Sequence, residues 1–94
     1  MTAIAGQEQA ETLALQALGY LAADEDRLSR FVLTTGLTPQ DLRQRAGDPM
    51  FLAGVLDYLM TDDALVVAFA EENAVAPEAV MAARRRLPGL SDEM

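Results

Sequence analysis

The order of the helices is set by residues 18–42, LGYLAADEDRLSRFVLTTGLTPQDL. Asp24 is a good N-cap, and the acids after it would lie in a first helical turn, where the helix dipole favours negative charge. Gly36 is a natural residue just beyond the end of that helix. Thr38 and Pro39 then read as the N-cap and first residue of a short helix. The stretch predicts a long helix, a cap, a second helix, a turn and a short third helix.

A second stretch follows the same pattern. Residues 56–80, LDYLMTDDALVVAFAEENAVAPEAV, align with residues 18–42 at an offset of 38. The identical pairs are Leu18/Leu56, Tyr20/Tyr58, Leu21/Leu59, Asp24/Asp62, Phe31/Phe69 and Pro39/Pro77. They are core residues, an N-cap and an N1 proline, so we expect two pseudo-repeated units, about 13–47 and 51–87. The alternative is that any two three-helix stretches share caps and leucines.

The rest of the chain also reads as helix. The expected helices run from Gln7 to Ala23, from Glu25 to a stop at Gly36, from Pro39 to a stop at Gly47, from Met50 to Met60, from Asp63 to about Glu72, and from Pro77 to about Leu87. The apolar run 65–70 could be a buried strand on composition, but its capped flanks favour a helix. The expected fold is therefore an all-α single domain over 1–94, with five or six helices and an ordered core of about 7–87.

The composition argues against enzyme chemistry. The 94 residues include no Cys, His or Lys, which removes disulfides, thiol nucleophiles, His bases and Cys/His metal sites. Acids do cluster, at 24–26, 62–63 and 71–72, but the first two clusters lie at expected helix starts. We expect no enzyme, no metal and no cofactor.

The charge is strongly negative and unevenly distributed. The formal net charge is −8, residues 46–83 hold no basic residue, and residues 27–45 carry Arg27, Arg30, Arg43 and Arg45 against one acid. Arg84, Arg85 and Arg86 form a second basic run, at the end of the last expected helix. Cations there complement the helix dipole, and the alternative is a docking patch for an acidic partner.

Targeting signals are not evident. No stretch reaches the ~20 apolar residues that span a bilayer. Residues 1–6 lack both the basic start and the long apolar run of a secretory signal. We therefore expect a cytoplasmic protein that does not enter a membrane.

Two expected helices are apolar on most sides, which suggests a partner. One carries Leu13, Leu15, Leu18 and Leu21, and the other carries Phe51, Leu52, Val55, Leu56 and Leu59. A helix that is apolar all round is buried on most sides or meets another chain. We expect a protein–protein interaction module, either a homodimer or a regulatory adaptor, and the alternative is a well-packed monomer. The expected partner-binding residues are Leu15, Tyr20, Phe51, Leu52 and Tyr58, in the contact or the core, and Arg84, Arg85 and Arg86, as a docking patch.

A second function class remains open. Residues 31–45 loosely resemble a helix-turn-helix. A DNA-binding module built on it would use Arg27 and Arg30, which precede this stretch, and Gln40, Arg43 and Gln44 within it. The short second helix and the acidic net charge oppose this interpretation, and nucleic acid is not the partner we expect.

The chain also resembles a known family. The segments involved are ALGYLAAD at 17–24, Arg30-Phe31, Thr35-Gly36-Leu37, Asp48-Pro49, Phe51-Leu52 and VLDYL at 55–59. Together they resemble the short bacterial proteins of domain of unknown function 3572, over about residues 7–87. The resemblance implies a small cytosolic helical protein without an assigned activity, and it supplies no catalytic or binding residues.

Overall fold

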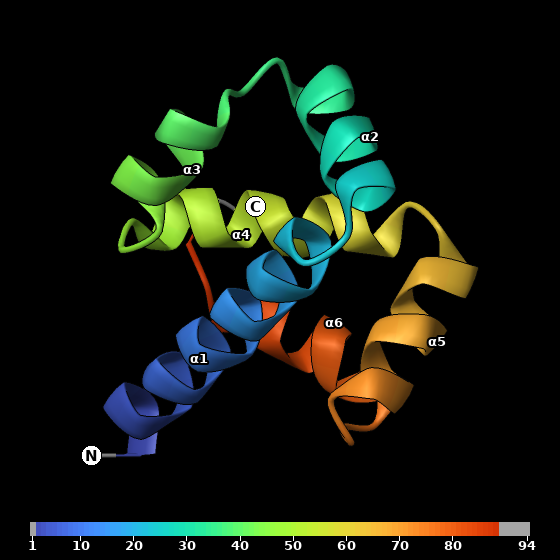
Figure 1. The fold of residues 1–94 in the computed structure, drawn as a ribbon. Coiled ribbons are helices and arrows are strands. Elements are labelled where there is room, and N and C mark those ends of the chain that lie inside the picture. The colour runs from blue at the N-terminus through green and yellow to red at the C-terminus, as the bar shows by residue number, and fades with distance from the viewer. Residues whose placement is uncertain (1, 89–94) are drawn as a thin grey trace.

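The computed structural model describes residues 2–88 and places six α-helices in them (Figure 1). These are α1 (Thr2–Ala22), α2 (Glu25–Thr35), α3 (Pro39–Arg45), α4 (Pro49–Met60), α5 (Asp63–Glu72) and α6 (Pro77–Arg85). No strand occurs in that range, so the expected all-α class is confirmed. The expected domain of 1–94 includes residue 1 and residues 89–94, which lie outside the described residues.

Most helix starts agree with the expected caps. The Asp24 carboxylate accepts the N–H of Arg27 at 3.0 Å, and Gly36 ends α2 in the left-handed region at φ 77°. At α3, the Thr38 hydroxyl accepts the Asp41 N–H at 3.1 Å, while the Asp41 carboxylate accepts the Thr38 N–H at 3.0 Å. These two bonds form a capping box, which satisfies backbone donors that the helix itself leaves unpaired.

The N-terminal helix is longer than expected. It begins at Thr2 rather than Gln7, because residues 2–6 contain no proline and include two alanines, the strongest helix formers. The last helix ends at Arg85, about two residues earlier than expected. Helix ends of this kind carry weak sequence signals, whereas capped starts carry strong ones.

The core lies where α1 and α4 meet. Figure 1 shows α1 running diagonally across α4, with α2 above the crossing and α5 and α6 below it, and α1 packs closely against α2, α4 and α6. The largest fully buried side chains are Phe31, Phe69, Leu21, Leu52, Leu56, Leu59, Val55 and Val80. One hydrophobic cluster therefore joins all parts of the chain from α1 to α6.

The two expected repeat units share helix boundaries and exchange aromatic contacts. At the offset of 38 residues, the ends of α1 and α4 coincide, as do the starts of α2 with α5 and of α3 with α6. Tyr20 packs edge-on against Phe69 at a centroid distance of 5.7 Å, and Phe31 packs edge-on against Tyr58 at 4.9 Å. Tyr20 corresponds to Tyr58 and Phe69 corresponds to Phe31, so exchanging the two units turns one aromatic pair into the other. A two-fold relation between the units would produce such a pattern.

The two units differ in what covers their last helix. Helix α4 is the counterpart of α1, but it is shorter at its N-terminal end. It begins at Pro49, which corresponds to Glu11 at the offset of 38, so the part of α1 before Glu11 has no helical counterpart. This extra length of α1 packs on α6. In Figure 1, α3 lies above α4, whereas the N-terminal end of α1 lies well below it.

Candidate interaction site

An apolar groove separates α1 from α3, and we call it the α1–α3 groove. It encloses about 350 Å³ and is lined by Leu15, Leu18, Gly19 and Ala22 of α1, Leu28 of α2, Pro39, Leu42 and Arg43 of α3, and the C-cap Ala46. The lining positions on α1 and on the α3 side each follow the spacing i, i+3, i+4, i+7. Such a set forms one stripe on a helix face and extends for about 10 Å. Side chains of α1 and of the α3 side therefore form the two walls of the groove.

The floor and walls of the groove are apolar. Leu18 and Leu42 are buried, whereas 44% of the Leu15 surface is exposed. A Cβ placed on Gly19 would meet no heavy atom of another segment within 4 Å, so the space above this residue is open. Arg43 is exposed and is the only charged residue in the lining.

Comparison with the second unit explains why the groove is open. Gly19 corresponds to Asp57 and Ala46 corresponds to Arg84. The Arg84 Nε donates to the Asp57 Oδ1 at 2.7 Å, and this ion pair joins α4 to α6. The first unit has no side chain long enough to make such a bridge at either position, so the corresponding space is empty.

The three C-terminal arginines do not form one patch. Arg84 is buried, and its Nη1 donates to the carbonyls of Leu87 and Pro88 at 3.4 and 3.3 Å. This agrees with the expected role of cations at a helix end. Arg85 and Arg86 are exposed.

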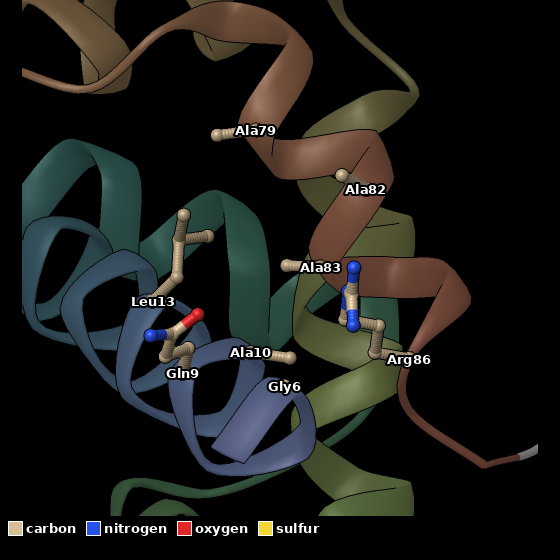
Figure 2. Close-up of a pocket in the computed structure, with 8 residues that line it drawn as sticks. All are labelled: Gly6, Gln9, Ala10, Leu13, Ala79, Ala82, Ala83 and Arg86. Atoms are coloured by element: carbon tan, nitrogen blue, oxygen red, sulfur yellow. The ribbon is translucent and has the colours of Figure 1, made fainter. Parts of the chain in front are cut away.

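Arg86 lies in a separate pocket between α1 and α6 (Figure 2). This pocket encloses about 430 Å³, and its lining consists of Gly6, Gln9, Ala10, Leu13, Ala79, Ala82, Ala83 and Arg86. A Cβ on Gly6 would collide with the Arg86 guanidinium, so the arginine fills the space that glycine leaves. The small side chains let the two helices approach closely, and the pocket is the margin of that helix packing rather than an independent site.

The arginines of residues 27–45 also differ in exposure and in their contacts within the chain. The Arg27 Nε donates to the Tyr20 carbonyl at 3.0 Å, and its guanidinium lies 3.8 Å from the Tyr20 ring centroid, a cation–π contact. Arg27 thus stabilises the α1–α2 corner. Arg30, Gln40, Arg43 and Gln44 are exposed.

The expected contact residues divide between core and surface. Tyr20 and Leu52 are buried in the core, and Phe51 and Tyr58 are half-buried at its edge. Leu15 alone among the five is exposed, and it lies in the α1–α3 groove. Sequence reasoning missed the small groove residues Gly19, Ala22 and Ala46, although comparing both units position by position would have revealed the exchange of large for small side chains.

The carboxylates act mainly at helix starts. Asp24, Asp48 and Asp62 accept backbone N–H groups as N-caps. The hydrogen bond from the Thr38 N–H lowers the pKa of Asp41, with a further contribution from the Thr38 hydroxyl. Within the described part of the chain, no group of three or more His, Cys, Asp or Glu side chains is placed to hold a metal ion.

Over residues 2–88, fold and surface together define a small all-α protein with an open apolar groove between α1 and α3. A family model described as "Protein of unknown function (DUF3572)" matches residues 7–90. The chain belongs to this family, which confirms the resemblance in its sequence. No curated protein and no solved structure matches the chain significantly. None of the helices in residues 2–88 is long and apolar enough to span a bilayer.

Proposed function

We propose that this chain is a non-enzymatic protein–protein interaction module of the bacterial cytoplasm, and that the α1–α3 groove receives an α-helix of a partner protein. The observation that carries the proposal is the pair of facing stripes with i, i+3, i+4, i+7 spacing. A groove of this form suits the apolar face of a helix, which presents its own anchors at the same spacing.

The energetic reason is the incomplete burial of Leu15. Burying a fully exposed leucine is worth about 1.5–3 kcal/mol, and Leu15 is 44% exposed in the isolated chain, so covering it would add about half of that. The empty space above Gly19 allows a partner side chain to approach the α1 backbone closely. A bound helix would remove both apolar walls from water.

A different protein is the favoured occupant, rather than a second copy. A two-fold dimer places the same surface of both copies together. Residues 27–45, which supply four of the nine groove residues, carry four arginines and one acid. A two-fold contact through the groove would bring these basic stretches together, which costs energy.

The test fills the groove without disturbing the fold. Gly19→Leu places an apolar side chain in the groove, and Gly54→Leu is the matched control, because Gly54 is also an exposed helical glycine with nothing within 4 Å of its Cβ. Each variant and the natural chain are used as bait in the native cell extract. Light scattering of the purified proteins measures self-association.

The proposal predicts a partner that the natural chain and Gly54→Leu retain and that Gly19→Leu loses. Self-association lost only in Gly19→Leu would keep the groove as the interface but make the occupant a second copy. The proposal would be contradicted if the natural chain and both variants captured the same partners and had the same molar mass by light scattering, because filling the groove would then have no effect.

DNA binding is the second candidate, and one observation favours it. A three-residue connection containing left-handed Gly36 joins α2 to α3, and Arg30, Gln40, Arg43 and Gln44 are exposed along these helices. That candidate predicts a salt-sensitive complex with duplex DNA that Arg43→Ala weakens. No shift of genomic fragments at about 50 mM salt would exclude it, because nonspecific affinity is highest at low salt.

A further inference from the structure

We infer that the partner helix is acidic: a carboxylate beside its apolar anchors pairs with Arg43 at the rim of the α1–α3 groove. This inference rests on the proposed function and specifies the chemistry of the occupant. It starts from the lining of the groove, where Arg43 is the only charged residue among apolar and small ones.

The second unit provides a template for this pairing. There, a carboxylate on α4, that of Asp57, bridges to a guanidinium on α6, that of Arg84, at 2.7 Å. The first unit has Gly19 in place of that carboxylate, and its arginine, Arg43, lies on the same face of the short helix, one turn before the position of Arg84. A partner carboxylate above Gly19 would restore the missing half of the bridge.

Arg43 is also available for a partner. Three other arginines are committed within residues 2–88: Arg27 to Tyr20, Arg84 to Asp57, and Arg86 to the space beside Gly6. Arg43 is exposed and makes no hydrogen bond or ion pair to any residue of this described range. Its cationic head can therefore pair with a partner while its stem lines the groove.

The net charge of −8 does not cancel this local attraction. The Debye length is about 8 Å at physiological salt, so distant acids are largely screened. The stretch from Arg27 to Arg45 has a local charge of +3, with Asp41 as its single acid. The Asp41 carboxylate is engaged with the Thr38 N–H at 3.0 Å.

The experiment uses the full chain and a displayed library of short helical peptides. Every peptide has apolar anchors at the spacing i, i+3, i+4, i+7, and its flanking positions are drawn from Glu, Lys, Gln and Ser. Binders are selected on the natural chain and then compared, by affinity, on Gly19→Leu, Arg43→Glu and Arg45→Glu. Arg45 is the matched control because it is an exposed arginine of α3 outside the groove lining.

The inference predicts that binders are enriched in Glu at the flanking positions. Gly19→Leu should abolish their binding, Arg43→Glu should weaken it about tenfold or more, and Arg45→Glu should change it less than about threefold. Binders that need Gly19 but carry Gln, Ser or Lys would overturn the acidic partner and leave the groove function standing. Glu-rich binders that are indifferent to Arg43→Glu would also overturn it. Failure to obtain any binder sensitive to Gly19→Leu would overturn the proposed function itself.

Discussion

Ala46 and Arg84 occupy equivalent positions at the offset of 38 residues, yet they lead to different surfaces. Arg84 bridges to Asp57 and to two carbonyls, and only 7% of its side chain is exposed. Ala46 has no polar side chain, and the space beside it belongs to the α1–α3 groove. Two single residues thus decide which unit closes this surface and which leaves it open.

Removing Arg84 should destabilise the fold strongly. Arg84→Ala loses the ion pair, the carbonyl contacts and buried packing, and we expect the free energy of unfolding to fall by about 2–3 kcal/mol. The cost stays at the low end for a buried pair because Asp57 is 52% exposed and keeps its hydration. Urea denaturation measures it, with exposed Arg85→Ala as the control at under about 0.5 kcal/mol. Equal effects of the two variants would contradict this role of Arg84.

Asp41 should make a small part of the stability depend on pH. The Thr38 N–H lowers the pKa of Asp41 below its usual value of 3.8 in the folded chain. The charged carboxylate therefore contributes stability that is complete above the unfolded value and is lost as pH falls through the lower, folded value. We expect the difference in unfolding free energy between the natural chain and Asp41→Asn to be constant near neutral pH and to shrink below about pH 4. A difference that stays constant into strong acid would disprove the linkage.

At the scale of the helix, starts were predictable and the groove was not. Asp24, Thr38 and Pro77 mark their helices because a cap or an N1 proline acts on the next few residues alone. The start of α1 carries no such mark and was predicted five residues late. The groove depends on how two helices distant in sequence face each other, and its key residues are small, so hydrophobic patterning does not detect them.

Gly54 and Gly36 should respond to substitution in opposite directions, because their backbone conformations differ. Gly54 lies in a regular helix with open space around its Cβ, so Gly54→Ala should raise the free energy of unfolding by about 0.5–1 kcal/mol. Gly36 has φ 77°, so Gly36→Ala should lower it by about 1–2 kcal/mol. Thermal unfolding of both variants checks the contrast. Two changes of the same sign would contradict the α2 cap.

At the scale of the whole molecule, the two units share one core rather than folding separately. Tyr20 of the first unit packs on Phe69 of the second, and Tyr58 of the second packs on Phe31 of the first. Two sequence matches at the offset of 38, Tyr20/Tyr58 and Phe31/Phe69, thus become two contacts between the units. The matches were visible in the sequence, but the partner of each aromatic ring was not, because it depends on the packing of α1 against α4.

These reciprocal contacts predict equal costs at equivalent positions. Phe31→Leu and Phe69→Leu each remove one edge-on aromatic pair from a fully buried site, and each should cost about 1–2 kcal/mol. Phe51→Leu is the control, because Phe51 is half-buried, and it should cost less than about 1 kcal/mol. Denaturant titrations that gave unequal costs for Phe31 and Phe69 would contradict the shared core.

Site-specific photo-crosslinking in the native cell tests most directly whether the α1–α3 groove is a binding surface. Ala22 lines the groove, whereas its neighbour Ala23 is exposed outside the lining. A photoreactive residue at position 22 should crosslink to another protein, and the same group at position 23 should not. Matching products from both positions, or none from position 22, would contradict the claim that this groove holds a partner.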